Sequence, residues 1–217
     1  MDHVHHPVDT RIHIQKEKIV NRGIAFFDFD GTITTKDTLF EIIKYQKGGS
    51  RFYWGFILLS PWLLAMKLKL ISNSRTKVRV LRHFFRNEPL EIFQQKCDAF
   101  IENRMGQLVR PLALKAIREH QARGHEVVVV SASAENWVRG WCHRIQMACI
   151  SSRLETRNGV LTGNLDGPNC NGPEKSRRIL ELYSLSDYDE IYCYGDTKGD
   201  KPMLELATFA YFKPFRN

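Results

Sequence analysis

The chain has 217 residues, of which 43% are hydrophobic and 26% are charged. This length and composition are typical of a globular protein with one sizeable core, and they exclude a disordered chain. The five cysteines are scattered without a CxxC pair, which argues against a zinc site or a disulfide framework and favours reduced thiols in the cytosol. Residues 1–22 contain no apolar run, so we expect no signal peptide and interpret them as a solvated tail. Metal binding by its histidine cluster is the lesser alternative.

The net charge of +8 is concentrated in one segment. No acidic residue occurs between Glu41 and Glu88. Ten residues in that interval are basic, namely Lys44, Lys47, Arg51, Lys67, Lys69, Arg75, Lys77, Arg79, Arg82 and Arg86. The rest of the chain therefore has a net charge of −2, and the basicity belongs to this segment alone.

The first predicted element is a strand over residues 23–30, GIAFFDFD. Its continuous apolar run, ending in acids, is typical of a strand buried on both faces of a parallel sheet. Residues 38–110 then show several helical patterns and no strand alternation. We therefore expect a helical insertion after the first strand, which is a candidate lid or cap.

A helix, a strand and a hairpin follow the insertion. Residues 111–123 have helical spacing that Gly124 ends, and residues 125–131, HEVVVVS, predict a second strand with a hydroxyl at its end. Residues 154–163 then indicate a β-hairpin that turns at Asn158-Gly159.

The last elements complete an alternating pattern. A helix over residues 173–183 begins with a proline at its first position, and residues 190–196, EIYCYGD, predict a third buried strand. Strands that alternate with helices indicate an α/β fold, here a doubly wound parallel sheet with an inserted helical cap. We expect a catalytic core of residues 23–37 and 111–217 and a cap of residues 38–110.

Polar side chains follow the predicted strands where each strand ends: Asp28 and Asp30, Ser131, and Asp196 with Asp200. In an open α/β sheet ligands bind beyond the carboxyl ends of the strands, so we expect these side chains to converge. Gly31 and Thr32 add a permissive backbone and a hydroxyl where the chain turns. Converging carboxylates repel each other unless a cation lies among them, and oxygen ligands favour Mg²⁺. Because Mg²⁺ commonly also binds phosphate oxygens, a phosphorylated substrate is predicted.

Each of these features is weak when it stands alone. Acids commonly follow strands, a serine such as Ser131 often ends one, and a lone Lys175 would ordinarily be a solvated side chain. Lys175 does stand in the first turn of a helix, where a cation opposes the helix dipole, so it has a local anion to meet. The features together, in this order and each at its expected element, form a strong signal.

The segments FDFDGTIT, VVVVSAS, GPEKS and YGDTKGDKPML resemble the four motifs of the haloacid dehalogenase-like hydrolase superfamily. The resemblance extends from Ile24 onward, and the insertion after the first motif is similar to the branch that contains phosphoserine phosphatase. It implies that Asp28 is the nucleophile that forms an aspartyl-phosphate. It also implies that Asp30 is the general acid and then the base, with Lys175 neutralising the developing charge.

The same resemblance implies two sets of ligands. The phosphoryl group would be bound by Gly31, Thr32, Ser131, Ala132 and Lys175. Mg²⁺ would be held by Asp28, the Asp30 carbonyl and Asp196, with Asp200 fixing these ligands from behind.

Two positions depart from the phosphoserine phosphatases. The acid nine residues after the nucleophile is Asp37 where they have Glu, and Gly199 stands where they usually have Asn. These departures weigh against phosphoserine as the substrate, and we treat Asp37 as a candidate specificity residue.

Three other classes of protein are alternatives to a phosphatase. A phospho-acceptor signalling domain has its acceptor on a later strand, lacks the DxD pair and has no large insertion. A catalytically idle binding protein is disfavoured because every motif residue is intact. A phosphotransferase, which passes the phosphoryl group to an alcohol, is left open by the motifs.

The cap contains an apolar stretch, residues 52–70, FYWGFILLSPWLLAMKLKL. Its uncharged part, residues 52–66, is shorter than the roughly 20 residues that span a bilayer, and Pro61 interrupts it. A single span would also separate the first motif from the other three. We therefore expect a re-entrant or interfacial helical hairpin about Ser60-Pro61.

The helix expected at residues 74–87 has a basic stripe of Arg75, Arg79, Arg82 and Arg86. We place Val78, Leu81, Phe84 and Phe85 away from that stripe. The stripe is interpreted either as the solvated side of a packed lid or as a surface for anionic lipid headgroups. Nucleic acid is disfavoured because the aromatic residues lie among aliphatic ones and do not interleave with the basic stripe.

An apolar and basic cap resembles that of the bacterial phosphatidylglycerophosphate phosphatases of the same branch. We therefore expect a cytoplasmic Mg²⁺-dependent phosphomonoesterase, peripheral to the inner face of the membrane, that acts on a lipid phosphate such as phosphatidylglycerophosphate. The alternative is a soluble small-molecule phosphatase such as a phosphoserine phosphatase.

Overall fold

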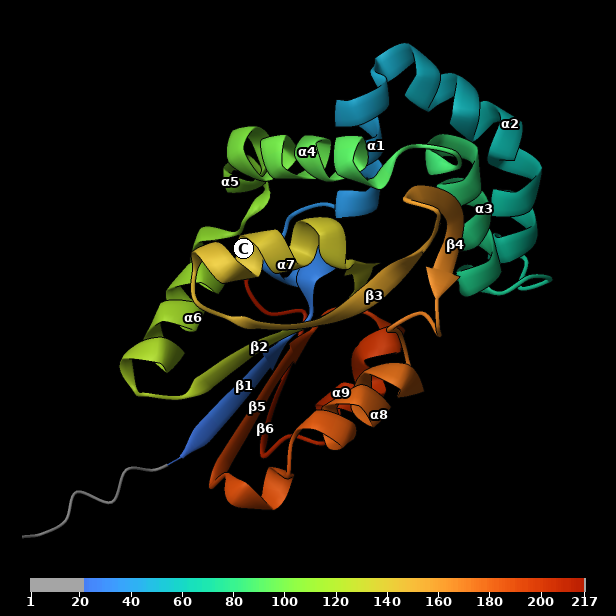
Figure 1. Ribbon diagram of the computed structural model, residues 1–217. Coiled ribbons are helices and arrows are strands. Elements are labelled where there is room, and N and C mark those ends of the chain that lie inside the picture. The colour runs from blue at the N-terminus through green and yellow to red at the C-terminus, as the bar shows by residue number, and fades with distance from the viewer. Residues whose placement is uncertain (1–21, 217) are drawn as a thin grey trace, which may run out of the picture.

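The computed structural model describes residues 22–216 (Figure 1). The predicted tail, with its histidine cluster, therefore lies outside the described residues except for Arg22. In this part of the chain the strands form one six-stranded sheet in the order β4-β3-β2-β1-β5-β6. Their bounds are β1 Gly23–Phe27, β2 Glu126–Ala134, β3 Ala148–Arg157, β4 Val160–Asp166, β5 Glu190–Gly195 and β6 Phe209–Phe212.

Neighbouring strands are parallel except for β3 and β4, which form an antiparallel hairpin. The hairpin turns at Asn158 and Gly159, both with positive φ, as the Asn-Gly pair predicts. The parallel strands alternate with helices along the chain. The predicted α/β fold with a doubly wound, mostly parallel sheet is confirmed.

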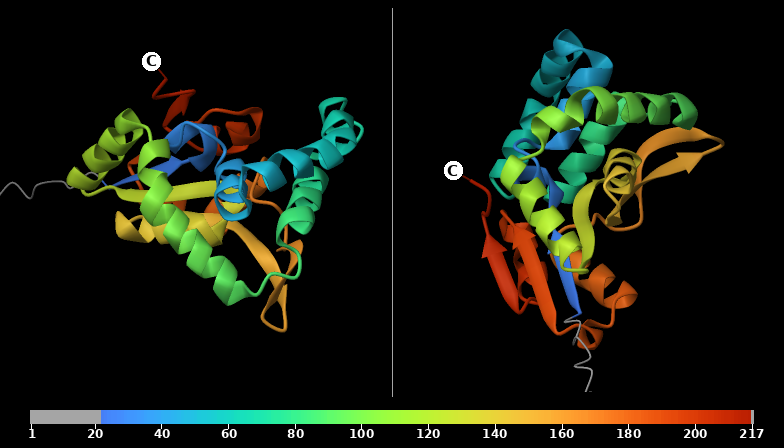
Figure 2. Two further views of the ribbon diagram at one scale, coloured as in Figure 1. Left: turned by 90° about the horizontal axis from the view of Figure 1, so that it is seen from above. Right: turned by 90° about the vertical axis from the view of Figure 1, so that its left-hand side faces the viewer.

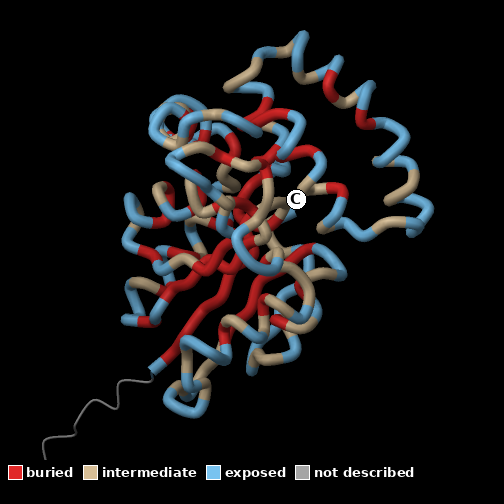
Figure 3. The backbone as a smooth tube through the Cα atoms, turned by 45° about the vertical axis from the view of Figure 1, so that its right-hand side comes forward, coloured by how far each residue is buried: buried red, intermediate tan, exposed pale blue. Residues whose placement is uncertain are grey.

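Successive residues of β1 face opposite layers of the molecule. Ala25 and Phe27 pack in a core with α6 (Pro111–Ala122), α7 (Glu135–Arg144) and the helices that follow β1. Ile24 and Phe26 pack on the other face with α8 (Pro173–Leu182) and α9 (Lys201–Leu204). All five residues of β1 are buried, as its unbroken apolar sequence predicts (Figure 3).

Five helices lie between β1 and α6, and they gather beyond the carboxyl ends of the strands (Figure 1, Figure 2). Their bounds are α1 Thr38–Lys47, α2 Gly49–Lys67, α3 Asn73–Phe85, α4 Leu90–Phe100 and α5 Gly106–Leu108. Single turns occur at η1 (Phe29–Ile33), η2 (Ile101–Met105), η3 (Leu185–Asp187) and η4 (Lys198–Asp200).

The β3–β4 hairpin joins the sheet to this helical segment. The N–H of Asn87 donates to the carbonyl of Leu161 at 2.8 Å, and the N–H of Leu161 donates to the carbonyl of Glu88 at 2.9 Å. The hairpin therefore contacts both parts of the fold, and the predicted boundaries of core and cap stay predictions.

The predicted helical hairpin about Ser60-Pro61 is wrong, because α2 is one continuous helix through Pro61. A proline at this position leaves the carbonyl of Ile57 without its usual N–H partner. The Ser60 hydroxyl donates to that carbonyl at 2.7 Å, which compensates for the missing donor. No helix within residues 22–216 has the length and apolar character needed to cross a bilayer.

Helix α3 has the two faces that its sequence predicts, with one exception. Leu81, Phe84 and Phe85 are buried, whereas Arg79 and Arg82 are exposed. Val78 is only half-buried and lines a groove with the arginines, so its predicted place away from the basic stripe is wrong. The physical reason is that Val78 lies one residue before Arg79 and three after Arg75, at the border of the stripe.

Candidate active site

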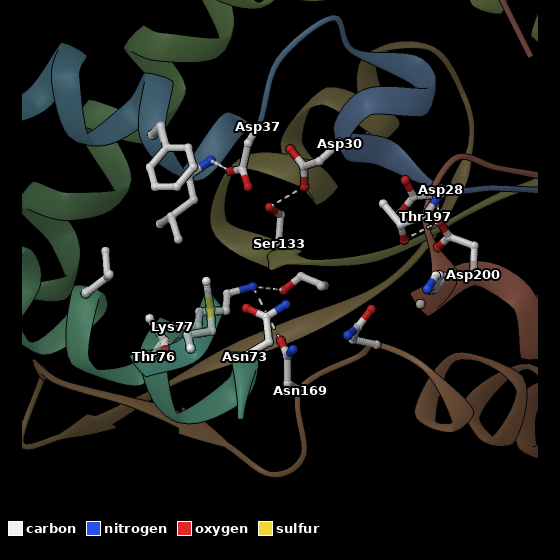
Figure 4. A pocket seen from close by; sticks show the side chains of 18 of the residues that line it. Asp28, Asp30, Asp37, Asn73, Thr76, Lys77, Ser133, Asn169, Thr197 and Asp200 are labelled. Atoms are coloured by element: carbon white, nitrogen blue, oxygen red, sulfur yellow. Dashed lines mark hydrogen bonds between the residues drawn. The ribbon is translucent and has the colours of Figure 1, made fainter. Parts of the chain in front are cut away.

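A cavity of about 380 Å³ lies between the carboxyl ends of the strands and helices α1 to α3 (Figure 4). The predicted site residues that line it are Asp28, Asp30, Asp37, Ala132, Lys175 and Asp200. The other four, Gly31, Thr32, Ser131 and Asp196, do not line the cavity but contact residues that do or lie beside them.

Asp28 is a buried carboxylate at the end of β1, where its N–H donates to the carbonyl of Tyr194 at 2.8 Å. Its Oδ1 accepts from Lys175 Nζ at 2.5 Å, and its Oδ2 accepts from the Thr32 hydroxyl at 3.2 Å. Burial raises the pKa of Asp28 to about 7, although Lys175 opposes the shift. Positive charge close to Asp28 is therefore needed to keep it ionised at neutral pH.

Lys175 lies in the first turn of α8 and is almost completely buried. Its Nζ also donates to Asp200 Oδ1 at 2.7 Å. Burial alone would lower the pKa of Lys175, but Asp28 and Asp200 outweigh it and raise the pKa above its ordinary value. The ammonium group therefore stays charged, and it has the local anions that its place in the helix indicates.

Asp200 fixes the loop after β5. Its Oδ2 accepts from the N–H groups of Asp196 at 3.1 Å and Thr197 at 2.9 Å, and from the Thr197 hydroxyl at 2.8 Å. Burial opposes ionisation of Asp200, yet Lys175 and the Thr197 hydrogen bonds hold its pKa below the ordinary value. This carboxylate is therefore an ionised support for the loop that carries Asp196.

Three carboxylates form a compact cluster, because one oxygen from each of Asp28, Asp196 and Asp200 lies within 4.8 Å of the others. Gly31, with φ of 84°, lies against Asp196, where any side chain at position 31 would collide with the carboxylate. Arg216 pairs with Asp196 Oδ2 at 2.5 Å. An all-oxygen donor set with this surplus of negative charge fits a hard divalent cation.

Asp30 has both carboxylate oxygens in hydrogen bonds. Its Oδ1 accepts from the N–H and hydroxyl of Thr38 at 2.7 and 2.6 Å, and its Oδ2 accepts from the Ser133 hydroxyl at 2.6 Å. Trp137 Nε1 donates to the Thr38 hydroxyl at 2.9 Å, which holds Thr38 in place. The carboxyl group is thus fixed at the cavity wall between the start of α1 and β2 (Figure 4).

Ser131 does not end its strand as the sequence predicts. Strand β2 continues to Ala134, because it pairs with β3 on both sides of a register shift between Ser131 and Ala134. The Ser131 hydroxyl is buried and accepts from the N–H of Ser133 at 3.0 Å. Ala132 and Ser133, at the shift, line the cavity.

Asp37 has a structural contact as well as a place in the cavity wall. Its side chain is the N-cap of α1 and accepts from the N–H of Leu39 at 2.9 Å. Burial, followed by the nearby Asp30, raises the pKa of Asp37 to about 6, although Lys77 opposes the shift.

Lys77 is a cavity residue that the sequence did not identify as part of the site. Its ammonium group, on α3, donates to the carbonyl of Ala132 and to Asn169 Oδ1, the latter at 3.4 Å (Figure 4). Burial lowers the pKa of Lys77, opposed by Asp30 and Asp37. Helical periodicity does place Lys77 opposite the arginine stripe of α3, which is the signal that could have found it.

Asn171 is a second unpredicted cavity residue, and it bears on the departure at Gly199. A side chain at position 199 would collide with the carboxamide of Asn171. In this chain Asn171 therefore occupies the space that the side chain of an asparagine at position 199, as expected in phosphoserine phosphatases, would need. Asn171 belongs to an irregular loop, so no periodic pattern points to it.

The family model of the haloacid dehalogenase-like hydrolases matches residues 25–205. Among curated proteins, the CicA protein of Caulobacter vibrioides is 32% identical over 195 residues, which cover 89% of this chain and 86% of that protein. A probable phosphatase of Mycobacterium tuberculosis is 27% identical over 87% of this chain and 68% of that protein. The chain belongs to the haloacid dehalogenase-like hydrolase family, so the predicted family and enzyme class are confirmed.

Solved structures share the fold. A protein of unknown function from Bordetella pertussis superposes with a TM-score of 0.74 at 20% identity, covering 87% of this chain and 88% of that protein. A phosphoserine phosphatase, solved as a phospho-aspartyl intermediate analogue, superposes with a TM-score of 0.63 at 17% identity over 86% and 84% of the two chains. At these identities the likeness establishes a common architecture.

Proposed function

We propose that the protein is a Mg²⁺-dependent phosphomonoesterase that acts through an aspartyl-phosphate on Asp28. The observation that carries the proposal is the environment of Asp28, a buried carboxylate at the cavity that is hydrogen-bonded to a charged Lys175 and clustered with Asp196 and Asp200. The probable phosphatase among the relatives and the phospho-aspartyl analogue among the solved structures support phosphoryl chemistry.

Asp28, Asp196 and the backbone carbonyl of Asp30 are the groups that would hold Mg²⁺. When bound, the ion supplies positive charge that favours the ionised form of Asp28 and neutralises phosphate oxygens. Asp200 contributes by fixing the loop of Asp196, and Lys175 contributes a permanent positive charge that is hydrogen-bonded to Asp28.

In the first step a carboxylate oxygen of Asp28 attacks the phosphorus, and the bond from phosphorus to the leaving alcohol breaks. The carboxyl group of Asp30 donates its proton to the leaving oxygen. Lys175, with the N–H and hydroxyl groups of residues 31, 32, 131 and 132, would hold the phosphoryl oxygens during this transfer.

In the second step the Asp30 carboxylate takes a proton from water, and the water oxygen attacks the phosphorus of the aspartyl-phosphate. The bond from phosphorus to Asp28 breaks, which returns a free carboxylate and releases inorganic phosphate. Thr38 and Ser133 keep Asp30 in one orientation for both proton transfers.

The leading substrate is a lipid phosphate or another amphiphilic phosphate, such as phosphatidylglycerophosphate. The cavity supports this class because helices α1 to α3 contribute a group of apolar side chains to its lining, beside the ammonium group of Lys77, while Asp28, Asp200 and Lys175 reach it from the strand ends and α8. The apolar wall consists of Leu39, Phe40, Leu63, Met66 and Val80. Action on such a substrate implies a protein on the cytoplasmic side, in peripheral contact with an anionic membrane through the cap.

A small soluble phosphate such as phosphoserine is the alternative substrate. The observation in its favour is that Asp37 and Lys77 bring one negative and one positive group to the same cavity. Such a pair would suit a compact substrate with both an ammonium and a carboxylate group.

A hydrolysis panel tests the proposal. Phosphate release is measured from phosphatidylglycerophosphate, phosphoserine and simple sugar phosphates, each with Mg²⁺ and with a chelator, and with an alcohol added to detect phosphotransfer. We expect metal-dependent release that is fastest with the lipid phosphate. Release that persists in chelator would overturn the metal-dependent mechanism, and a preference for phosphoserine would establish the alternative.

A further inference from the structure

Helix α2 and the turn after it carry an apolar surface that residues 22–216 leave uncovered. Nearly half of the exposed large hydrophobic residues in this part of the chain fall between positions 53 and 70: Tyr53, Trp54, Ile57, Leu58, Trp62, Leu64, Leu68 and Leu70. The inner side of the helix is also apolar, with Gly55 and Leu59 buried. A helix that is apolar all round is normally enclosed by protein or lipid, so this exposed surface is typical of a contact site.

A groove of about 380 Å³ runs between α2 and α3 beside this surface. We name it the arginine groove after the residues that line it, which are Trp62, Ile71, Ser74, Arg75, Val78, Arg79 and Arg82. The Arg79 guanidinium carbon lies 3.5 Å from the centre of the Trp62 ring, so a cation–π contact holds the guanidinium group against the ring. Arg82 Nε donates to the Asn164 side chain at 2.8 Å.

The arginine groove has no carboxylate in its lining, and its arginines lack the counter-charges that several other described arginines have. Within residues 22–216, Arg139, Arg144 and Arg177 each pair with a glutamate. Arg75, Arg79 and Arg82 form no such pair with the described carboxylates, and no acid occurs on the chain between Glu41 and Glu88. Three guanidinium groups at one groove without carboxylates form a site for an anion.

The arginine groove and the cavity are adjacent. Leu63 and Asn73 line the cavity, whereas their sequence neighbours Trp62 and Ser74 line the groove. Between these residues the chain turns from α2 into α3 and exposes Leu68 and Leu70. The apolar surface, the groove and one wall of the cavity therefore meet at the α2–α3 turn.

We propose that the arginine groove binds the phosphodiester headgroups of an anionic bilayer while the apolar surface of α2 inserts among the lipid chains. Guanidinium groups bind phosphate oxygens in pairs, and Trp, Leu and Ile side chains enter the headgroup boundary. The inference rests on the proposed function only for its choice of a lipid phosphate as substrate. It adds a lipid-binding site outside the cavity and a defined orientation, with the α2–α3 turn toward the membrane.

A second copy of the chain is a poorer partner for the same surface. A two-fold contact would bring the arginine groove of one copy against a surface that has no acids of its own. Nucleic acid is also a poorer partner, because Trp62, the aromatic residue in the lining of the groove, is already stacked on Arg79 and offers no free face between the arginines for a base.

Vesicle binding of the full-length protein tests the inference. Co-sedimentation is measured with phosphatidylcholine vesicles and with vesicles that also contain phosphatidylglycerol, at low and high salt. The groove variant is Arg75→Gln with Arg79→Gln, and the apolar variant is Ile57→Ser with Leu58→Ser. The control, Arg118→Gln with Arg123→Gln on and after α6, makes the same change in net charge on exposed residues elsewhere.

We expect the wild type to bind the anionic vesicles and to lose binding as salt rises, because salt screens the arginines. The groove variant should bind on the order of tenfold more weakly, and the apolar variant should also lose binding, whereas the control should bind like the wild type. If the groove variant and its control weaken vesicle binding equally, net charge alone explains the binding, and the arginine groove is not a lipid-binding site.

Two further readouts separate the possible failures. Sedimentation analysis shows whether the wild type dimerises. If the wild type is a dimer and the apolar variant is a monomer, a second copy of the chain is the partner of this surface, and the proposed contact with a bilayer is wrong. Hydrolysis of p-nitrophenyl phosphate, a soluble substrate, is measured for all variants. If the variants lose vesicle binding but still hydrolyse p-nitrophenyl phosphate, their defect lies in membrane binding and not in the active site. If the wild type binds vesicles but shows no hydrolysis, the proposed function is contradicted and the membrane site still stands.

Discussion

At the scale of single residues, the groups around Asp28 have opposing effects on its pKa. The carboxylate is buried beside Asp200 and Asp30, which raise its pKa, and only Lys175 opposes them among the groups with the largest effects. In the metal-free protein the pKa rises from the ordinary 3.8 to about 7. Stability that comes from protonated Asp28 is therefore fully present below about pH 4 and is lost as the pH rises through about 7.

Asp28→Asn removes both the buried titratable carboxylate and the proposed nucleophile. We expect metal-dependent phosphate release to fall by on the order of a thousandfold or more, because no covalent intermediate can form. In chelator, the free energy of unfolding of the wild type should fall relative to that of Asp28→Asn as the pH rises from 4 to 7. Denaturant titrations at several pH values measure the difference; parallel pH profiles for the two proteins would contradict the raised pKa.

Asp37 combines a cap with a charge, and two substitutions separate these properties. Asp37→Ala loses the acceptor for the N–H of Leu39 and should lower the free energy of unfolding by about 1 kcal/mol. Asp37→Asn keeps an acceptor at the N-cap and should leave the stability close to that of the wild type. If Asp37 selects the substrate, Asp37→Asn should still change KM severalfold for a charged substrate, measured by steady-state kinetics. Unchanged kinetics in Asp37→Asn would leave Asp37 with the cap alone.

At the scale of elements, α2 shows where sequence patterns reach their limit. A proline inside an apolar run is a sound signal for a break, and the expected helical hairpin follows from it. The helix continues because the hydroxyl of Ser60 bonds to the carbonyl that Pro61 leaves open. This compensation depends on one side-chain orientation, which residue type and spacing do not specify.

A double-mutant cycle tests that compensation. Pro61→Ala restores an N–H that can donate to the carbonyl of Ile57, so it should stabilise the protein, by at most the roughly 3 kcal/mol that separates the two residues inside a helix. Ser60→Ala should destabilise the wild type by about 0.5 to 1 kcal/mol, yet have little effect when Ala is present at position 61. Urea titrations of the four proteins measure the coupling. Equal effects of Ser60→Ala in both backgrounds would show that the hydroxyl is not the compensating donor.

The strands and the residues at their ends could be predicted from the sequence for a physical reason. A strand buried on both faces, such as β1, must be continuously apolar, and parallel strands bring their carboxyl ends to one edge. Residues that reach the cavity from helices and loops lack such a constraint. Periodicity places Lys77 on the face of α3 opposite the arginine stripe but does not identify the cavity that this face meets, and Asn171 belongs to a loop without a pattern.

At the scale of the whole molecule, the helices α1 to α5 are tied to the sheet by the β3–β4 hairpin as well as by the chain ends. Backbone hydrogen bonds cross from residues 87–90 to the hairpin at three N–H groups, those of Asn87, Leu90 and Leu161. A cap held at this junction cannot swing away from it without breaking all three bonds. Substrate entry is then expected from the side of α2 and α3, where the apolar wall of the cavity lies.

Native-state hydrogen exchange tests whether these three hydrogen bonds hold the cap to the hairpin. The amides of Asn87, Leu90 and Leu161 should exchange as slowly as the amide of Asp28, which is bonded to β5 in the centre of the sheet, because the junction opens only with the core. The amide of Leu68, at the exposed end of α2, should exchange orders of magnitude faster. Exchange of the three junction amides at a rate close to that of Leu68 would instead mean that the cap separates from the hairpin while the sheet stays folded. Access to the cavity would then be controlled by movement of the whole cap and not by the α2–α3 side alone.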